Sequence, residues 1–397
     1  MLDFEFYAPT RILFGREAMD RLPQMLETCG ATKVLLAHYG AASPKAPVAD
    51  AIAVLEKASI PYIEFTGIQP NPLLSRALEG IELCKKEQVD FILSVGGASV
   101  IDTCKAIAAG VKLREDEDIW EDYYFPKIRF GGEALSIGVV LTIPAAGSEA
   151  SFGSCITEDS TMQKRYTGGE CLLPKFAVLN PVYTTTLPPY QTACGAIDIL
   201  AHLLERYFVN FPNVDLSDRM IEACARTILI NAPGVLRNPD DCAARGEIMW
   251  AGSIAHNKIL EMGRTHGDWA SHDIGHELSG AYDMAHGASL AVILPSYIRY
   301  VYKYNIPRFM QCANRIFDVD IAYDRPDDVI EEMIRRLERF CEDLGVPTKL
   351  KGYDIDDARF EEMAAKALDG RKHVGTGWGI HLLGKADVIE VFKLSLQ

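Results

Sequence analysis

The first half of the chain alternates short apolar runs with segments of helical periodicity. Strand–helix alternation at this spacing is typical of parallel βαβ units, which build a sheet covered by helices. Two further apolar runs near the end of this half predict additional strands. The predicted strands are residues 33–40, 61–65, 90–97, 134–144 and 176–181, and the predicted helices are residues 48–60, 73–88 and 99–111.

From about Pro188 onward the pattern is helical. Pro188 and Pro189 suit the first turn of a helix, where the missing N–H of proline would have no helical partner in any case. We therefore predict an α/β domain of Rossmann-like type over residues 1–187 and an all-α domain over residues 188–397. Long amphipathic segments in the second domain predict helices at residues 216–230, 243–260 and 328–344.

Composition places the chain among ordinary globular proteins, because 48% of its 397 residues are hydrophobic and 24% are charged. Its net charge of -15 argues against a nucleic acid or an anionic membrane as partner, since both need a positive surface. The start of the chain lacks the pattern of a signal peptide, and the longest apolar run, residues 135–147, is too short to cross a bilayer. Ten scattered cysteines without a Cys-x-x-Cys pair predict reduced thiols, so we expect a cytoplasmic protein.

Turns of small residues follow three of the predicted strands. In one of them, Gly96 and Gly97 let the backbone approach a ligand closely, and Ser99 adds a hydroxyl at the helix start. The free N–H groups and the helix dipole there favour an anion such as a pyrophosphate. A plain strand-to-helix turn explains an isolated Gly-Gly pair equally well, and the sequence lacks the G-x-G-x-x-G pattern. Together with the turns at 38–43 and 144–150, however, it would line the carboxyl edge of one sheet, where open α/β sheets bind nucleotides.

Histidines and an aspartate in the second half have the spacing of metal ligands. Asp198 and His202 lie four residues apart, as do His272 and His276, so each pair shares one helix face. His286 begins a further predicted helix. A carboxylate–histidine pair at this spacing is most often a surface pair, but the first pair sits in the apolar run AIDILAHLL, where an unpartnered carboxylate is costly. Imidazole and carboxylate groups suit Zn²⁺ or Fe²⁺, and we expect a metal site here.

Six motifs occur along the chain: PTRILFG, GGASVIDTCK, PAAGSEAS, FAVLNP, GAIDILAH and SHDIGHELSGAYDMAHGASLAV. Together they resemble the iron-containing (group III) alcohol dehydrogenases, in their butanol dehydrogenase and NADPH-dependent aldehyde reductase branch. The resemblance covers essentially the whole chain, with the motifs in the correct order. It implies an N-terminal dinucleotide-binding domain and a C-terminal metal-binding catalytic domain. It also implies hydride transfer between nicotinamide C4 and a small to medium aldehyde or primary alcohol, with the metal as Lewis acid.

The resemblance implies roles for individual residues. His276 matches the family's non-ligand histidine near the nicotinamide, and we assign a catalytic role to it and to Asp102. The ligands of the divalent metal, Fe²⁺ or Zn²⁺, match Asp198, His202, His272 and His286. Cofactor contacts match Gly40, Ser43, Gly96, Gly97, Ser99, Asp102, Thr142, Ser148 and Lys164.

Three positions depart from the family pattern. Ala98 stands where the family turn has a third glycine, which is tolerable only if the backbone φ there is negative. Ala146 stands where threonine is common, and Asn180 stands where aspartate is usual. None of these departures touches the expected metal ligands.

The turn after the first cofactor strand bears on the choice of cofactor. An acidic residue there would bind the ribose hydroxyl of NAD and repel a 2′-phosphate. The segment AHYGAASPK has no acid, whereas Gly40, Ser43 and Lys45 offer room, a hydroxyl and a positive charge. We therefore favour NADP(H) over NAD(H), although a lysine taken alone is more often simply solvated.

Other classes of protein share part of the pattern. A dehydroquinate-synthase-like lyase has the same two-domain plan and uses NAD, but it needs several basic residues for its substrate, and only Lys258 and Arg264 lie close to the histidines in sequence. The His-Asp dipeptide at His272 occurs in metal-dependent phosphohydrolases, whose chains are all-helical. A non-catalytic nucleotide-binding protein would have a broken metal set. The family often dimerises through its N-terminal strands, so residues 4–15 are the expected interface of a homodimer.

Overall fold

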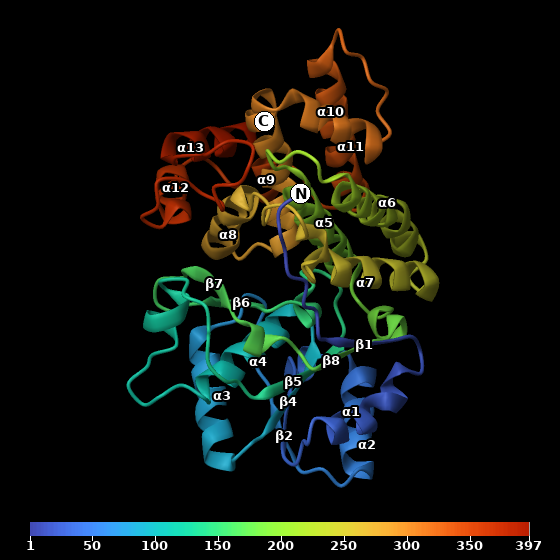
Figure 1. The fold of residues 1–397 in the computed structure, drawn as a ribbon, viewed down its shortest axis with the longest axis vertical. Coiled ribbons are helices and arrows are strands. Elements are labelled where there is room, and N and C mark those ends of the chain that lie inside the picture. The colour runs from blue at the N-terminus through green and yellow to red at the C-terminus, as the bar shows by residue number, and fades with distance from the viewer. Residues whose placement is uncertain (397) are drawn as a thin grey trace. The chain divides into compact units, whose positions relative to one another are not determined.

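The computed structural model describes residues 1–396, which form two compact units (Figure 1). The chain changes unit at the predicted boundary between residues 187 and 188, but neither unit is one continuous segment. The α/β unit comprises Tyr7–Leu187 and Pro239–Asn257, and the helical unit comprises Met1–Phe6, Pro188–Asn238 and the chain from Lys258 onward.

A six-stranded parallel sheet forms the centre of the α/β unit, in the order β1-β8-β5-β4-β2-β3. Its strands are short and mostly buried, as expected where helices cover both faces of a parallel sheet. A separate antiparallel hairpin of β6 (Gly153–Thr157) and β7 (Lys164–Gly168) was not predicted. The strands of the sheet are β1 (Arg11–Phe14), β2 (Val34–Ala37), β3 (Tyr62–Phe65), β4 (Phe91–Gly96), β5 (Ser136–Leu141) and β8 (Phe176–Leu179).

The two faces of this sheet are buried under different helices (Figure 1). Leu35 of β2 lies opposite Ile92 of β4, and both belong to the core that includes α3 (Leu74–Glu87) and α4 (Ala98–Gly110). The next pair, Leu36 and Leu93, faces the core that includes α1 (Leu22–Thr28) and α2 (Lys45–Lys57). Because successive strand residues point to opposite faces, these near-continuous apolar runs fill both cores.

Helix α7 (Cys242–His256) belongs to the α/β unit, although the predicted boundary places it in the second domain. Gly147 approaches this helix so closely that a Cβ atom would lie 2.7 Å from the carbonyl oxygen of Gly252. Ser253 donates a hydrogen bond to the buried Glu149 carboxylate at 2.5 Å. These contacts, which the helical periodicity of α7 does not encode, explain why it packs with the sheet.

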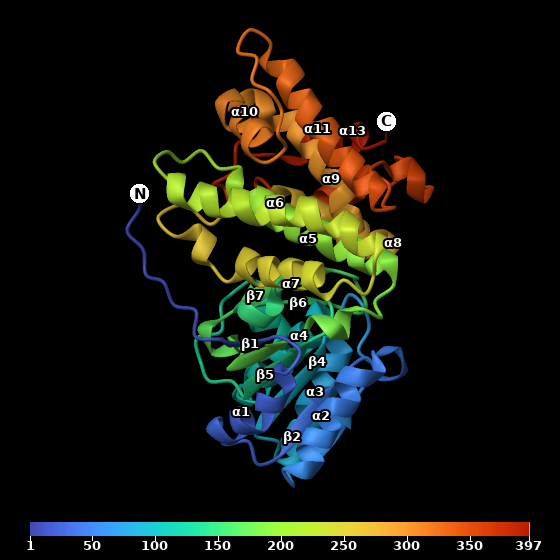
Figure 2. The same ribbon diagram turned by 90° about the vertical axis from the view of Figure 1, so that its right-hand side faces the viewer.

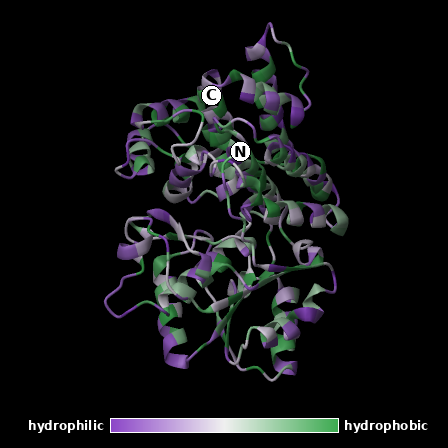
Figure 3. Ribbon diagram, in the orientation of Figure 1, coloured by the Kyte–Doolittle hydropathy of each residue, from purple (hydrophilic) through white to green (hydrophobic). Residues whose placement is uncertain are grey.

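The helical unit is built around α5 (Pro189–Tyr207), which packs against α6 and α9, while α8 packs against α9 and α12. Figure 2 shows α5 and α6 side by side. Almost every residue of α5 and α9 is buried, and Figure 3 shows apolar residues gathered inside and hydrophilic residues on the outer helices. The predicted α/β plus all-α fold class is thereby confirmed. The other helices are α6 (Asp215–Arg237), α8 (Ala270–Tyr282), α9 (His286–Val301), α10 (Ile306–Arg315), α11 (Pro326–Asp343), α12 (Phe360–Leu368) and α13 (Lys385–Leu394).

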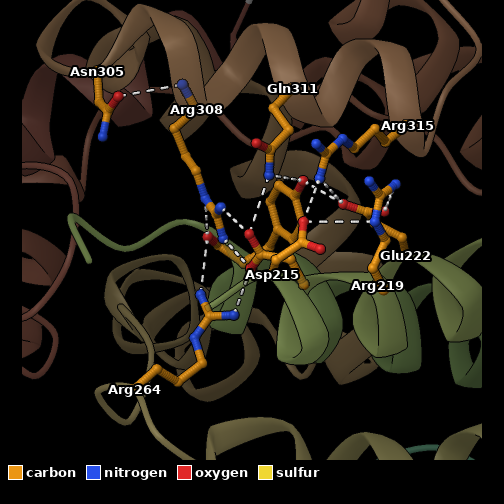
Figure 4. Close-up of polar contacts among 10 residues, drawn as sticks. Asp215, Arg219, Glu222, Arg264, Asn305, Arg308, Gln311 and Arg315 are labelled. Atoms are coloured by element: carbon orange, nitrogen blue, oxygen red, sulfur yellow. Dashed lines mark hydrogen bonds and ion pairs between the residues drawn. The ribbon is translucent and has the colours of Figure 1, made fainter. Parts of the chain in front are cut away.

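A buried network of charges fastens the end of α5 (Figure 4). The carboxylate of Asp218 accepts hydrogen bonds from Arg264 at 2.8 Å and from Arg308 at 2.5 and 2.7 Å. Both arginines also donate to the carbonyl oxygen of Tyr207, the last residue of α5, which has no partner within its own helix. Burial lowers the pKa of Arg264 to about 10, so the guanidinium stays charged at neutral pH.

Replacing Asp218 with alanine is expected to destabilise the protein by about 3–5 kcal/mol, because it leaves two buried guanidinium groups without their carboxylate. Urea denaturation followed by circular dichroism measures the change. Asp324→Ala is the matched control, since Asp324 forms an exposed ion pair with Arg325 and should cost less than about 1 kcal/mol. If both substitutions lowered the free energy of unfolding equally, the buried ion pairs of Asp218 would not be important for stability.

Candidate functional site

Helix α5 supplies two of the predicted metal ligands, Asp198 and His202, which are both buried. His202 Nδ1 lies 2.8 Å from the backbone carbonyl oxygen of Asp198 and 3.1 Å from its Oδ1 atom. Since a carbonyl oxygen can only accept, Nδ1 carries the proton and Nε2 keeps its lone pair. Burial also lowers the pKa of His202, which favours the neutral imidazole that a metal requires.

His272 of α8 and His286, the first residue of α9, meet this pair at the Asp198 carboxylate. The Nε2 atoms of His272 and His286 lie 4.0 and 3.7 Å from Asp198 Oδ1. One ligand atom from each of Asp198, His202 and His272 can be chosen so that all lie within 4.8 Å of one another. We call Asp198, His202, His272 and His286 the histidine–aspartate cluster.

The histidine–aspartate cluster fits a divalent cation. Among residues 1–396, the Asp198 Oδ1 and His272 Nε2 atoms are buried and have no hydrogen-bond partner. A buried carboxylate oxygen without a donor is costly, and a cation between it and the imidazole nitrogens removes that cost. Three imidazoles and one carboxylate form a donor set that suits Fe²⁺ and Zn²⁺ alike.

Glu205, which the sequence analysis missed, supports the cluster from behind. It is completely buried on α5, its carboxylate contacts His272 Nδ1 and Ser271 Oγ, and it accepts a hydrogen bond from the His272 backbone N–H at 3.1 Å. Burial alone would raise the pKa of Glu205, but His272 and these hydrogen bonds lower it below its ordinary value. An ionised carboxylate at Nδ1 keeps the proton there and leaves Nε2 toward Asp198. A sequence signal existed, since Glu205 directly follows the apolar run that contains Asp198 and lies three residues after His202.

His276 lies one turn beyond His272 and is half-buried. Its ring centroid lies 6.3 Å from that of His272 and 5.0 Å from that of His286, so it borders the histidine–aspartate cluster. Asp273, between the two histidines of α8, accepts hydrogen bonds from Arg371 and from the backbone of Gly375, both at 2.8 Å. Its carboxylate therefore anchors the segment that precedes α13.

In the α/β unit, the predicted cofactor residues gather at the carboxyl ends of β2, β4 and β5. These strands are neighbours and run parallel, so their following turns lie at one edge of the sheet. The turns carry Gly40 and Ser43 after β2, Gly96, Gly97 and Ser99 at the end of β4 and the start of α4, and Thr142 and Ser148 after β5.

Close packing explains the glycines of the central turn. A Cβ atom on Gly96 would lie 2.4 Å from a methyl group of Val100, and one on Gly97 would lie 2.9 Å from Ile143. Ala98 begins α4 and does not adopt a positive φ, so its methyl group is compatible with the turn. The departure from the three-glycine pattern therefore leaves the loop shape intact.

The remaining predicted residues differ in their surroundings. Both oxygens of the half-buried Asp102 are occupied, since they accept from Ser148 Oγ at 2.5 Å and from the Cys155 backbone at 2.9 Å. That geometry is typical of a residue that holds structure, and it does not show the catalytic role expected for Asp102. Lys164, at the start of β7, donates to Asn71 at 3.3 Å. The Thr142 hydroxyl is buried without a hydrogen-bond partner among residues 1–396.

An acidic residue approaches the first turn from the neighbouring strand. Glu64 of β3 lies 3.1 Å from His38 Nε2, and the backbone N–H of Gly40 donates to His38 Nδ1 at 3.0 Å. Nδ1 of His38 therefore carries no hydrogen, and Nε2 donates its hydrogen to Glu64. Glu64 lies on a different strand from the turn, and only the pairing of β2 with β3 brings it to this position.

Comparisons with known proteins agree over both halves of the chain. A model described as iron-containing alcohol dehydrogenase matches residues 9–181, and one described as Fe-containing alcohol dehydrogenase family, C-terminal, matches residues 192–395. The probable NADH-dependent butanol dehydrogenase 1 of Bacillus subtilis is 38% identical over 397 residues and covers 100% of both chains. The NADPH-dependent aldehyde reductase of Escherichia coli is 33% identical, over 92% of this chain and 93% of its own.

Solved structures give the same result. The crystal structure of an NADH-dependent butanol dehydrogenase A from Thermotoga maritima superposes with a TM-score of 0.93 and 33% identity, over 100% of this chain and 99% of the other. No helix within residues 1–396 is both long and apolar enough to cross a membrane.

Proposed function

Since the chain belongs to the iron-containing alcohol dehydrogenase family, and is an NAD(P)-dependent alcohol dehydrogenase or aldehyde reductase, we propose that the histidine–aspartate cluster holds its catalytic metal. The family match confirms the dehydrogenase prediction over the lyase alternative. One observation carries the proposal: three histidines from three helices converge on the buried Oδ1 atom of Asp198, which no donor satisfies within residues 1–396.

A divalent metal bound there would supply Lewis-acid chemistry at a substrate oxygen, and the dinucleotide would supply or accept the hydride. The chain's own residues prepare the site for this chemistry. Burial keeps His202 neutral, and Glu205 holds the His272 proton on Nδ1. The donor set contains one carboxylate and three neutral imidazoles, so it supplies a single negative charge. A divalent cation bound there therefore keeps a net positive charge and stays electrophilic. The half-buried His276 borders the cluster and is our candidate for moving a proton.

We assign dinucleotide binding to residues 1–187, through the turns after β2, β4 and β5, and metal binding to residues 188–397. The glycine turn before α4 offers free N–H groups to a pyrophosphate. The expected substrates are small to medium aldehydes and primary alcohols, in keeping with relatives named as butanol dehydrogenases and an aldehyde reductase.

The direct test uses purified protein with measured iron and zinc content. We expect NADPH oxidation with butanal and NADP⁺ reduction with butanol, both in proportion to bound metal. Removing the metal by chelation should abolish both rates, and adding Fe²⁺ or Zn²⁺ should restore them. Full activity of protein that holds no metal would overturn the proposal.

We further propose NADP(H) as the preferred cofactor, because the turn after β2 has no acid and offers Gly40, Ser43 and the exposed Lys45. Glu64, an acid that lies near this turn, is hydrogen-bonded to His38. Among the relatives both NADH-dependent and NADPH-dependent enzymes occur, so the preference rests on these residues alone.

Replacing Lys45 with methionine is expected to raise the KM for NADPH by roughly three- to tenfold and to leave the KM for NADH unchanged, because only NADPH carries a 2′-phosphate to pair with the ammonium group. Steady-state kinetics with each cofactor measures the effect. Lys57→Met, at the other end of the same helix, is the control and should change neither KM. An equal change for both cofactors would rule out a phosphate contact by Lys45.

We also propose a homodimer formed through residues 4–15. Phe4, Phe6, Tyr7 and Phe14 in this segment are all exposed in the single chain. β1 lies at the edge of the sheet and pairs only with β8, so its outer backbone groups are open to a second strand. Light scattering coupled to gel filtration should give twice the chain mass of 43.9 kDa, and a monomer would refute the proposal.

A further inference from the structure

Lys105 is a buried cation that the proposed chemistry does not use. It lies on α4 with no exposed surface. Its Nζ atom lies 2.7 Å from the carbonyl oxygen of Ser148, 2.9 Å from that of Ser151 and 2.8 Å from that of Gly153. A fourth oxygen, the Ser148 hydroxyl, lies 3.0 Å away. All four oxygens belong to residues 148–153 and surround the ammonium group.

These partners require the charged form of the lysine. Carbonyl oxygens can only accept, and three of them need three N–H hydrogens, which an ammonium group has and a neutral amine does not. Burial lowers the pKa of Lys105 to about 8, although Asp102 and Glu149 counteract this effect. At neutral pH the group is therefore mostly an ammonium ion.

The segment that Lys105 holds leads from β5 into β6. It contains a single short turn, Ser148–Ala150, closed by a 3.4 Å hydrogen bond from the Ser151 N–H to the Ser148 carbonyl oxygen. Without the ammonium that carbonyl would keep only this long bond, and the buried carbonyl of Ser151 would lose its Lys105 donor. On its other side, Gly147 and Glu149 contact α7. The segment is thus held between the lysine of one helix and the backbone and hydroxyl groups of another.

A relay of hydrogen bonds connects the lysine to the cofactor edge. The positive charge of Lys105 lies 3.0 Å from Ser148 Oγ and directs the hydroxyl hydrogen away from itself, and this hydrogen is donated to Asp102 at 2.5 Å. Asp102 receives a second hydrogen bond from the Cys155 backbone and is held in place by it. The direction of the Ser148 hydroxyl is therefore set by Lys105.

We propose that Lys105 is a positioning residue for the dinucleotide, which fixes the Ser148–Gly153 segment and the direction of the Ser148 hydroxyl before the cofactor arrives. The proposal rests on the proposed function, in that the carboxyl edge of the sheet binds the cofactor. Lys105 itself touches no cofactor and acts through Ser148. Loss of its charge should weaken cofactor binding without affecting the metal, whose proposed ligands all belong to the helical unit.

The principal test compares Lys105→Met with Arg245→Met. Arg245 is another buried cation of the α/β unit, and its hydrogen bonds go to Pro239 and Thr184, which lie outside the Ser148–Gly153 segment. Titration by NADPH fluorescence should show a rise of about tenfold or more in the Kd for Lys105→Met and less than twofold for Arg245→Met. Metal content per chain should be unchanged in both. An unchanged Kd in folded Lys105→Met would overturn the proposal.

A second measurement needs no variant and covers the case in which Lys105→Met fails to fold. In the natural protein the Kd for NADPH should rise as the pH passes about 8, because the amine loses the third hydrogen that its carbonyl partners need. Over the same pH interval, Lys105 keeps its proton in the unfolded chain but has released it in the folded protein. This group therefore makes the fold more stable as the pH rises, so unfolding would not explain a loss of NADPH affinity. The other titratable groups that face Lys105 are two thiols, Cys104 and Cys155, and two carboxyl groups, Asp102 and Glu149. Burial raises the pKa of both thiols to about 12, above this window, and also raises the pKa of both carboxyl groups above their ordinary values.

The outcomes separate the two proposals. If the natural protein binds neither NADPH nor NADH, the proposed cofactor edge is wrong. If it binds NADPH with a Kd that is constant from pH 7 to about pH 9, or equally well after Lys105→Met, the cofactor edge stands and the role of Lys105 is refuted.

Discussion

Protein with His272 replaced by alanine is expected to lose its metal and its activity together. His272 contributes the Nε2 atom that faces Asp198 from α8, and its loss leaves at most three of the four proposed donors. Lewis-acid stabilisation contributes several kcal/mol, so kcat/KM for butanal reduction should fall by at least about a thousandfold. Elemental analysis of the purified variant should find less than about a tenth of the natural metal content.

His381→Ala provides the control for this experiment. His381 belongs to the same helical unit but stacks on Tyr304 with a centroid distance of 3.7 Å and contacts no member of the histidine–aspartate cluster. It should retain both metal and activity. If His272→Ala kept the natural metal content, another set of ligands would have to be sought.

Replacing Glu205 with glutamine should weaken the metal affinity by about 10- to 100-fold while leaving the fold intact. The amide nitrogen of glutamine donates to His272 Nδ1, which favours the tautomer with its proton on Nε2, the atom needed for the metal. Competition with a chromogenic chelator measures the affinity. Excess Fe²⁺ or Zn²⁺ should restore much of the activity, because the four proposed ligands are still present.

Glu222→Gln is a suitable comparison, since Glu222 is another buried carboxylate of the helical unit, paired with Arg315 and Tyr207 away from the cluster. Both variants lose a buried charge, so a general loss of stability would affect them alike. Only Glu205→Gln should change the competition with the chelator. A metal affinity that is the same in both variants would remove Glu205 from the site.

The sequence predicts most elements of this fold because apolar periodicity reports local structure. The strand–helix alternation before residue 111 predicts each of the β2–α4 elements within a few residues. The β6–β7 hairpin was missed because its strands, such as KRYTG, carry too few apolar residues to show a pattern. The unit to which α7 belongs was also beyond reach, because it depends on Gly147 and Glu149, about a hundred residues away.

The candidate site, like the fold, could be predicted only in part from the sequence. Histidine spacing and the apolar context of Asp198 predicted which side chains converge, and the structure brings all four of them together. Residue spacing could not predict the side chains that support the site residues through contacts with them. Glu205 and Lys105 act through their contacts with His272 and Ser148, and such contacts between distant segments appear only when the chain is folded.

Each unit is built from segments that are not continuous in sequence, and this affects folding during synthesis on the ribosome. The α/β unit is closed by α7, whose last residue is His256, so its final contacts form only after that residue has left the exit tunnel. By then the α5 and α6 segments have already been made, and α5 remains uncovered until α9 packs against it. Nascent chains of about 190 residues would therefore expose the α7-binding surface around Gly147, and chains stalled at this length should be the ones that chaperones retain.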